Sequence, residues 1–302
     1  MKLSLWPESI KARVTLSALG VFLLSLWVLA FLTTQILERD ISQLVANAQT
    51  SAAIQMASRI DTELQSRLAA LEHKASLIDD DLMADPLALQ QDLEQTPLLK
   101  SFFNVSVLAV NAEGIAIADT PYLAERIGLN YRDRVDAFAA ALDQGRATVG
   151  SPLIGQSTGQ PLIPLAVPIR NESGEVIGAL GGAIDLSKPN FFDDLTEMGY
   201  GQTGHYSVVS ASKRMIVTSS NVDLIMADLP EPGINPVLDR AILNDEGSTY
   251  HYTTVQGIDT LATTRSLETT DWLVAVMTPV TEAFAPIHDM QRRMTLITLA
   301  VT

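Results

Sequence analysis

Four polar side chains stand next to apolar segments where they could hold a small charged molecule. Tyr131, Arg134 and Asp136 belong to a charged turn that leads into a short apolar helix, and Asp185 follows a run of small and apolar residues. The planar guanidinium of arginine can bind a carboxylate through two parallel hydrogen bonds, and an aspartate can bind an ammonium group. The sequence therefore predicts that these four residues form a binding site for a small polar ligand: an amino acid, a carboxylate or an amine.

Three of these side chains also have a purely structural interpretation. Arg134 could form an internal ion pair with Asp133 or Asp136. Asp185 could cap a helix that starts near Ser187, because an aspartate is a favoured residue just before a helix. The tyrosine of the turn could pack on the edge of a sheet. The sequence leaves these alternatives open.

A helix and a β-hairpin must position the four residues. The helix is predicted over Ala137–Leu142 and should end at Gly145, since glycine readily adopts the left-handed conformation found at helix ends. Pro161–Ile169 and Val176–Leu186 are strand-like runs, and the segment Asn171-Glu172-Ser173-Gly174 between them is a typical hairpin turn. The predicted site therefore lies where a short helix meets an antiparallel sheet.

The same pattern of strands and helices occurs twice, at offsets of about 100 residues. This repetition predicts two related modules of antiparallel sheet with covering helices, at residues 81–188 and 189–285. The fold class is therefore α+β. The repeated segments are Ser106–Val110 and Tyr206–Val209, Ile115–Ala118 and Met215–Thr218, Ala137–Leu142 and Pro236–Leu243, and finally Leu162–Leu186, matched by Leu261–Arg265 with Trp272–Met277.

Residues 35–80 are predicted to form a long stalk helix. The segment from Gln35 to Ile78 contains neither glycine nor proline, and its apolar residues recur at spacings of three and four, which indicates a helix with one apolar stripe. We expect this helix to pack on the modules and to mediate a homodimer near the membrane. The stripe consists of Ala57, Ile60, Leu64, Leu68, Leu71, Ala75 and Ile78.

Residues 14–34 form an uncharged stretch of 21 residues. About 20 such residues cross a bilayer as a helix, whereas the apolar part of a secretory signal has only about 7–15. Because basic residues precede the stretch, residues 1–13 are expected in the cytoplasm and residues 35–291 outside the membrane. Residues 286–302 are expected to form an exit helix and the start of a second, truncated transmembrane helix.

The composition excludes several other classes of function. The net charge of −15 argues against a nucleic-acid partner, because phosphate contacts need clustered basic residues. The chain has no cysteine, and its four histidines show no metal-ligand spacing, so neither a metal nor a cofactor is predicted. Gly155–Gly159 fits the hydrolase motif G-x-S-x-G around Ser157, and Gly199–Gly204 fits the dinucleotide motif G-x-G-x-x-G. Both lack the strand-then-helix context that these motifs require, so both are predicted to be loops.

The order of membrane span, long helix, two modules and second span resembles the double Cache family of bacterial extracytoplasmic sensors, whose modules are PAS-like. Amino-acid-sensing members carry an arginine and a later aspartate that match Arg134 and Asp185, but Asp136 and Ala137 replace their tryptophan and tyrosine. The segment Pro279–Pro286 looks most like the exit segment of GGDEF diguanylate cyclase sensors. The other resembling segments are Tyr131–Arg134, Gly145–Gly150, Ser157–Pro161, Ala166–Arg170, Gly178–Leu186 and Gly201–Gly204.

The resemblance implies a sensor region of a signalling protein in the bacterial inner membrane, with residues 35–291 in the periplasm or outside. On this hypothesis the chain itself is not an enzyme, and ligand binding in the membrane-distal module controls an output domain outside the chain. The implied output is a diguanylate cyclase, with or without a phosphodiesterase. The alternatives are a chemoreceptor or a histidine kinase. A membrane-tethered periplasmic hydrolase that uses Ser157 is an alternative of a different class.

Overall fold

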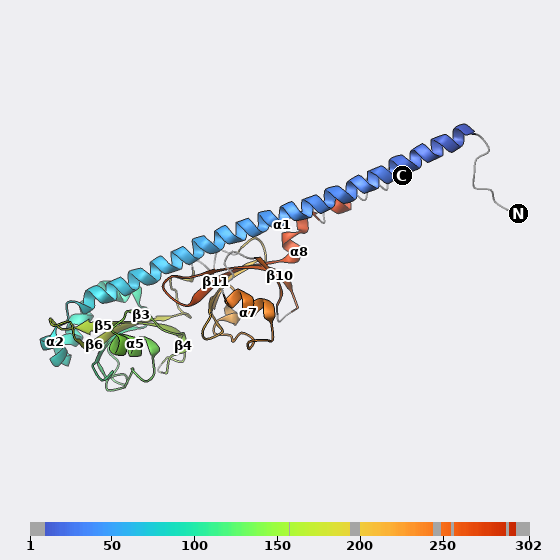
Figure 1. Cartoon of the computed structure of the whole chain (residues 1–302). Coiled ribbons are helices and arrows are strands. Elements are labelled where there is room, and N and C mark those ends of the chain that lie inside the picture. The colour runs from blue at the N-terminus through green and yellow to red at the C-terminus, as the bar shows by residue number, and fades with distance from the viewer. Residues whose placement is uncertain are drawn as a thin grey trace.

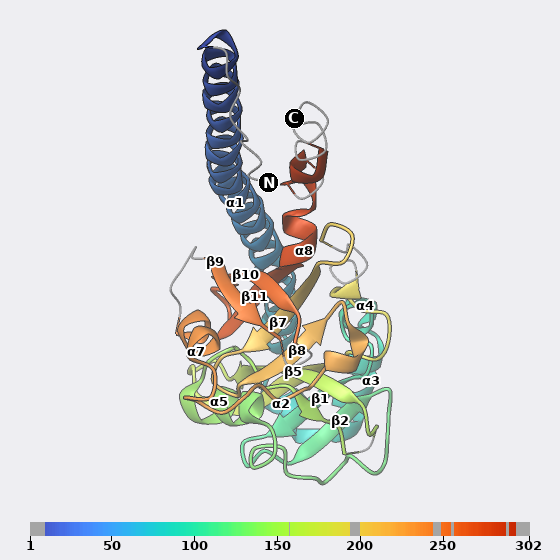
Figure 2. The same cartoon turned by 90° about the vertical axis from the view of Figure 1, so that its right-hand side faces the viewer.

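The computed structural model describes residues 10–156, 158–193, 200–243, 249–254, 257–287 and 290–293. One helix of 66 residues, α1 (Ile10–Ala75), forms a rod, and two β-sheet modules lie along one side of it (Figure 1). We call the module at the C-terminal end of α1 the distal module and the other the proximal module. The view in Figure 2 looks along the two modules and shows α8 (Val280–Ala283) leaving the proximal sheet on the side of α1.

The apolar stripe predicted on α1 is the side of the helix that contacts both modules. Six of the seven predicted positions lie on α1; five of these are buried and Leu68 is partly buried, while Ile78, also buried, lies just beyond the end of the helix. Their spacing of three and four places them on one face of a helix with 3.6 residues per turn. Because the same buried cluster includes side chains of both sheets, α1 joins the two modules through one continuous core.

The distal sheet has the strand order β2-β1-β6-β5-β3, and β4 pairs with β5 next to β3. The central pair is a long antiparallel hairpin, as the sequence predicts, in which Leu162 lies opposite Asp185 and Pro164 lies opposite Ala183. The strands are β1 (Ser106–Asn111), β2 (Ala116–Thr120), β3 (Thr148–Val149), β4 (Leu153–Ile154), β5 (Pro161–Arg170) and β6 (Val176–Asp185).

The proximal sheet has the order β8-β7-β11-β10-β9, which matches the distal order strand for strand. This correspondence confirms the two related modules predicted from the repeated segments. Trp272 opens β11 and is almost fully buried. The strands are β7 (His205–Ser210), β8 (Met215–Ser219), β9 (Thr249–Thr253), β10 (Asp259–Ser266) and β11 (Trp272–Pro279).

Short helices cover the sheets. In the distal module, α5 ends at Gly145, whose φ of 59° is left-handed as predicted, and Arg170 donates a hydrogen bond to the Gly145 carbonyl at 2.9 Å. Helix α3 begins at Pro86, and the Asp85 side chain accepts hydrogen bonds from two backbone N–H groups of its first turn. The helices are α2 (Asp80–Ala84), α3 (Pro86–Glu94), α4 (Pro97–Phe102), α5 (Asp136–Gln144), α7 (Pro236–Ile242) and the 3-10 turn η1 (Val222–Leu224).

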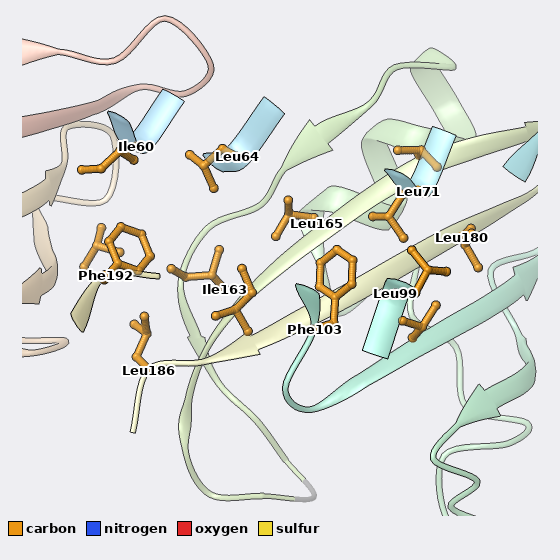
Figure 3. Close-up of a cluster of buried hydrophobic side chains, with 14 of the residues drawn as sticks. Ile60, Leu64, Leu71, Leu99, Phe103, Ile163, Leu165, Leu180, Leu186 and Phe192 are labelled. Carbon is orange, nitrogen blue, oxygen red and sulfur yellow. The ribbon is translucent and has the colours of Figure 1, made fainter. Parts of the chain in front are cut away.

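The two faces of the distal sheet have different neighbours. Side chains alternate along a strand, and Ile163, Leu165 and Leu180 point toward α1 and α4, where they pack with Leu64 and Phe103 (Figure 3). The opposite face meets α5 in a second, smaller apolar cluster that includes Leu108, Ala166 and Phe138. The second face therefore carries the turn from Tyr131 to Asp136.

Within the described residues, no helix meets the combined requirement of length and apolarity for a membrane span. The described part of the exit segment includes α8 and residues 290–293, which are helical. The predicted start of a second transmembrane helix after residue 293 lies outside the described residues.

Candidate ligand-binding site

A cavity of about 190 Å³ opens on the α5 side of the distal sheet. Strands β1, β5 and β6 form its floor, and the turn before α5 and the segment around β4 form its walls. Its lining is mostly apolar, with a few polar groups. The polar lining residues are Ser106, Arg126, Tyr131, Arg134, Gln156 and Thr158.

The cavity exists because small residues on β6 leave space next to an aromatic ring. A side chain at Gly181 would collide with the ring of Phe138 and with the Leu165 carbonyl, so glycine permits α5 to lie close to the sheet here. The next residue on the same face of β6, Ala183, is also small and lines the cavity. Phe138 and Tyr131 contact each other at one wall, with ring centroids 5.6 Å apart.

Arg134 and Tyr131, two of the predicted site residues, both line the cavity. The Arg134 guanidinium donates a hydrogen bond from Nη1 to the Gln156 side-chain oxygen at 2.8 Å. Its partner is therefore a neutral amide rather than Asp133 or Asp136. Burial raises the pKa of Tyr131, partly offset by the nearby Arg126 guanidinium, so its hydroxyl is a neutral hydrogen-bond donor at physiological pH.

Asp136 lies outside the cavity lining. Its carboxylate accepts hydrogen bonds from the Ser151 backbone N–H at 3.0 and 3.1 Å and from the Ser151 hydroxyl at 2.5 Å. It also stands at the N-terminus of α5, where the helix dipole favours a negative charge. The structure thus places Asp136 where it fastens the segment before β4 to the start of α5.

Asp185 is fully buried at the end of β6. Its Oδ1 accepts hydrogen bonds from the Ser187 N–H at 2.8 Å and the Ser187 hydroxyl at 2.6 Å. Its backbone N–H and carbonyl are both bonded to the Asn104 side chain. Residues 187–192 do not form a helix, so Asp185 stabilises a turn rather than a helix start. Residues 194–199 lie outside the described residues.

The other carboxylate oxygen of Asp185 has a different environment. Among the described residues, Oδ2 is buried without a hydrogen-bond partner, and Lys188 Nζ lies 3.5 Å from it. Asp185 does not line the cavity, but it lies directly opposite Leu162, which does. Residues opposite each other in an antiparallel pair share a face of the sheet, so Asp185 occupies the row of the cavity floor next to Ala183.

Three further polar residues at this site did not follow from the sequence reasoning: Arg126, Gln156 and Asp119. Arg126 is buried, lines the cavity and forms an ion pair with Asp119 at 3.2 Å. Burial raises the Asp119 pKa from 3.8 to about 6, although Arg126 acts in the opposite direction. The sequence contained a usable signal, because Asp119 is an acidic residue near the end of a mostly apolar strand, much as Asp185 is at the end of β6.

The structure also bears on the two sequence motifs G-x-S-x-G and G-x-G-x-x-G. Ser157, the proposed nucleophile of the hydrolase alternative, lies outside the described residues. The described part of the G-x-G-x-x-G segment is a loop before β7, as predicted. Backbone N–H groups of this loop bind a carboxylate side chain of the same protein. Glu282 of α8 accepts hydrogen bonds from the backbone N–H groups of Gln202 at 2.6 Å and Thr203 at 2.7 Å. Among the described residues, no cluster of histidine and acidic side chains suits a metal ion.

This architecture, a long helix carrying two matching antiparallel modules with a cavity in the distal one, is that of a double Cache sensor. The family model dCache_1, a Cache domain, matches residues 33–287, and the chain therefore belongs to the Cache domain family. It is an extracytoplasmic ligand-binding sensor region, and its relatives are receptors rather than enzymes.

Among curated proteins, the chain is similar to methyl-accepting chemotaxis protein McpA of Pseudomonas putida, with 27% identity over 227 residues. The match covers 74% of this chain and 34% of McpA, so the chain spans about a third of that relative.

The solved structures with a similar fold include ligand-binding domains of chemoreceptors. That of CtaA from Pseudomonas fluorescens, in complex with L-isoleucine, has a TM-score of 0.65 and 23% identity, and the match covers 82% of this chain and 97% of that one. PctB from Pseudomonas aeruginosa PAO1, with L-Arg, gives 0.64 and 20%, covering 82% and 93%. PctC from the same strain, with GABA, gives 0.60 and 21%, covering 78% and 100%. These relatives do not support the resemblance to diguanylate cyclase sensors.

Proposed function

We propose that the distal cavity binds a small ligand that carries a carboxylate, with amino acids as the first candidates. The observation that carries this proposal is the pair of groups at the cavity. Within the part of the chain that the structure describes, Arg134 lines the cavity with a neutral hydrogen-bond partner, and Asp185 has a buried carboxylate oxygen without a hydrogen-bond partner in the next row of the cavity floor. The amino acids and GABA bound by the related chemoreceptor domains are molecules of this class.

Each proposed role follows from the chemistry of the group. The Arg134 guanidinium can form a charge-assisted hydrogen bond to a ligand carboxylate in place of its bond to Gln156. The Tyr131 hydroxyl can donate to the same carboxylate, and Asp185 Oδ2 can accept from a ligand ammonium group. Asp136 acts indirectly in this proposal, because its bonds to Ser151 fix the wall opposite the turn.

The size and polarity of the cavity set the class of ligand. A cavity of about 190 Å³ has room for several water molecules and suits a metabolite of amino-acid size. Apolar side chains such as Leu108, Leu129 and Ile154 line the remainder and suit the hydrocarbon part of the ligand.

The membrane arrangement is also a proposal. Residues 14–34 would anchor the chain in the bacterial inner membrane, with residues 35–291 outside and a second span beginning within residues 286–302. This is supported by the uncharged stretch of α1 and by its apolar side chains, of which Val14, Val21 and Leu29 are more than 60% exposed. A homodimer through the stalk part of α1 would place two sensors side by side at the membrane.

Signal transmission would use the contacts between α1, the proximal module and α8. Gln49 of α1 is fully buried and donates hydrogen bonds to the Leu261 carbonyl and the Thr278 hydroxyl of the proximal sheet. Glu282 ties α8 to the loop before β7. A ligand shifts an equilibrium between two states only through its different affinity for them. The two states here would differ in how α1 and α8 lie at the membrane.

We further propose that the output domain outside this chain is that of a methyl-accepting chemoreceptor, as in McpA. A diguanylate cyclase stays the second candidate on the single observation of the exit segment Pro279–Pro286. Expression of the complete protein separates them: a chemoreceptor output gives ligand-dependent methylation, and a cyclase output gives ligand-dependent synthesis of cyclic-di-GMP.

The binding proposal is tested by a thermal-shift screen of the full chain in detergent against amino acids, carboxylates and amines. A ligand present at 100 times its dissociation constant should stabilise the folded state by about 2.7 kcal/mol. Arg134→Gln and Asp185→Asn should lose this shift. Arg132→Gln is the matched control, since Arg132 is two residues away and pairs with Asp143 at the surface. Retention of the shift in both site variants would refute the proposal.

A further inference from the structure

A second guanidinium reaches the cavity from the segment between β2 and α5. Arg126 is 8% exposed and lines the cavity together with Arg134. Its hydrogen bonds both come from Nη1, to Oδ1 of Asp119 at 3.3 Å and to Oδ2 at 3.2 Å. Within the described residues, Nε and Nη2 have no hydrogen-bond partner, so three of the five N–H groups of this fork are not used by the protein.

In the ion pair between Arg126 and Asp119, the Asp119 backbone is held in place, but the distances between the two charged groups are long. The Asp119 backbone is fixed by Gln90 of α3, which accepts from its N–H at 2.9 Å and donates to its carbonyl at 2.7 Å. An arginine that binds a carboxylate through both arms of its fork usually does so at about 2.7–2.9 Å. Here a single nitrogen contacts both oxygens at longer distances. The pair therefore holds Arg126 in place and leaves most of its binding capacity free.

The charges around the cavity leave a surplus of positive groups. Arg134 has a neutral partner, and Asp119 serves only one nitrogen of Arg126. Of the acidic groups nearby, Asp136 binds Ser151, and the free oxygen of Asp185, 3.5 Å from Lys188 Nζ, is the acceptor that the proposed function assigns to a ligand ammonium group. The Arg126–Asp119 pair is neutral as a whole, so the surplus consists of the charge of Arg134 and the unused N–H groups of Arg126. Two guanidiniums with unused donors at one small cavity favour a ligand that brings two carboxylates.

We propose that Arg126 is a specificity-determining residue and that the cavity prefers ligands with two acidic groups, such as dicarboxylic acids or amino acids with an acidic side chain. This inference rests on the proposed function, in which Arg134 holds the first carboxylate. Arg126 would then bind the second one through Nε and Nη2 while Nη1 stays on Asp119. One charge-assisted hydrogen bond of this kind changes affinity by about 10- to 150-fold.

The test compares ligands that differ only in the second acidic group. L-glutamate and L-glutamine are titrated calorimetrically into the full chain in detergent, with succinate and L-alanine as further probes. We expect L-glutamate to bind about 10- to 150-fold more tightly than L-glutamine. Equal affinities would overturn the proposal, and so would binding of L-alanine without binding of either diacid. That last result would leave the proposed function standing, whereas failure of every carboxylate to bind would refute both.

Variants of the ion pair distinguish a ligand role from a structural one. Asp119→Asn releases Nη1 of Arg126 and should increase the preference for L-glutamate. Asp119→Asn combined with Arg126→Gln removes both charges and should abolish the preference, so that L-glutamate binds no more tightly than L-glutamine. A pair with only a structural role would weaken all ligands equally in both variants, which would contradict the proposal. If the double variant does not fold, Arg126→Lys keeps the charge and should lose part of the preference, while Arg132→Gln should keep all of it.

Discussion

The buried carboxyl of Asp119 should make the stability of the distal module depend on pH in an identifiable way. Burial raises its pKa to about 6 in the folded chain, against 3.8 for the free side chain, despite the opposing effect of Arg126. The folded state therefore binds a proton more tightly than the unfolded state does. The contribution of Asp119 to the free energy of unfolding therefore falls as pH rises from about 3.8 through about 6, because in this range the carboxyl ionises readily in the unfolded chain but not in the folded one.

The magnitude follows from the two pKa values. Their difference corresponds to about 3 kcal/mol at about 1.4 kcal/mol per pKa unit, which is the full cost of ionising Asp119 in the folded state. Roughly half of it, about 1.4 kcal/mol, is regained when pH is lowered from about 7.5 to about 5. At about 2.1 cal/mol/K of unfolding entropy per residue, 1 kcal/mol shifts the melting temperature of a chain of this length by about 1.6 °C. The Asp119 contribution should therefore raise Tm by about 2 °C over this interval.

The assay is thermal unfolding of the full chain and of Asp119→Asn in detergent at a series of pH values. The difference between the two curves isolates Asp119 from His205, whose pKa is lowered by burial and whose protonation in the unfolded chain acts in the opposite direction over the same interval. Asp143→Asn, which removes a half-exposed surface carboxylate, is the reference for a simple loss of charge. If wild type and Asp119→Asn have parallel Tm curves between about pH 7.5 and about pH 5, Asp119 is not the buried, proton-binding group described here.

Three further predictions concern residues outside the ion pair. Trp272→Ala should lower the free energy of unfolding by about 3–5 kcal/mol, since the ring is 1% exposed; wild-type stability in chemical denaturation would show a different proximal core. Glu282→Gln should lower the free energy of unfolding by about 1 kcal/mol near neutral pH. Burial raises the pKa of Glu282, but hydrogen bonds from Gln202 and Thr203 outweigh it and lower this pKa, so the difference between wild type and variant should fade as pH falls below about 4.5. A difference that does not depend on pH would contradict this. Asp136→Ala should lower Tm through its lost bonds to Ser151, whereas unchanged Tm with abolished ligand binding would indicate direct contact with the ligand.

The sequence predicted the arrangement well wherever periodicity reports burial. The spacing of Ile60, Leu64 and Leu71 indicated the buried face of α1, because a helix repeats every 3.6 residues. The repeated hairpins indicated two modules, since alternating apolar runs with a tight turn leave few other ways to pair. Strand β9 and helices α2–α4 were not predicted, because β9 is polar and half-exposed and the helices are only one or two turns long.

The site was harder to predict, because its contacts join distant segments. Arg134 and Tyr131 followed from one charged turn, but the partner of Arg134 is Gln156, 22 residues away in a loop with no distinctive pattern. No sequence motif around Arg126 marks it as a site residue, and its proposed role in ligand binding depends on its burial beside Asp119. A sequence gives residue types and spacing along the chain, whereas the desolvation that raises the Asp119 pKa depends on helices and strands packed around it.

The central claim is that Arg134 binds the carboxylate of a ligand in the distal cavity. The most direct measurement compares four binding affinities. Wild type and Arg134→Gln are each titrated with the best ligand of the screen and with its carboxamide, so that the guanidinium of the protein and the charge of the ligand are removed separately and together. Wild type should bind the carboxylate about 10- to 150-fold more tightly than the amide. Arg134→Gln should bind both with similar, weak affinity, because the two changes remove one interaction and are therefore not additive. If Arg134→Gln discriminates between carboxylate and amide as strongly as wild type does, the carboxylate is bound elsewhere and the account is wrong.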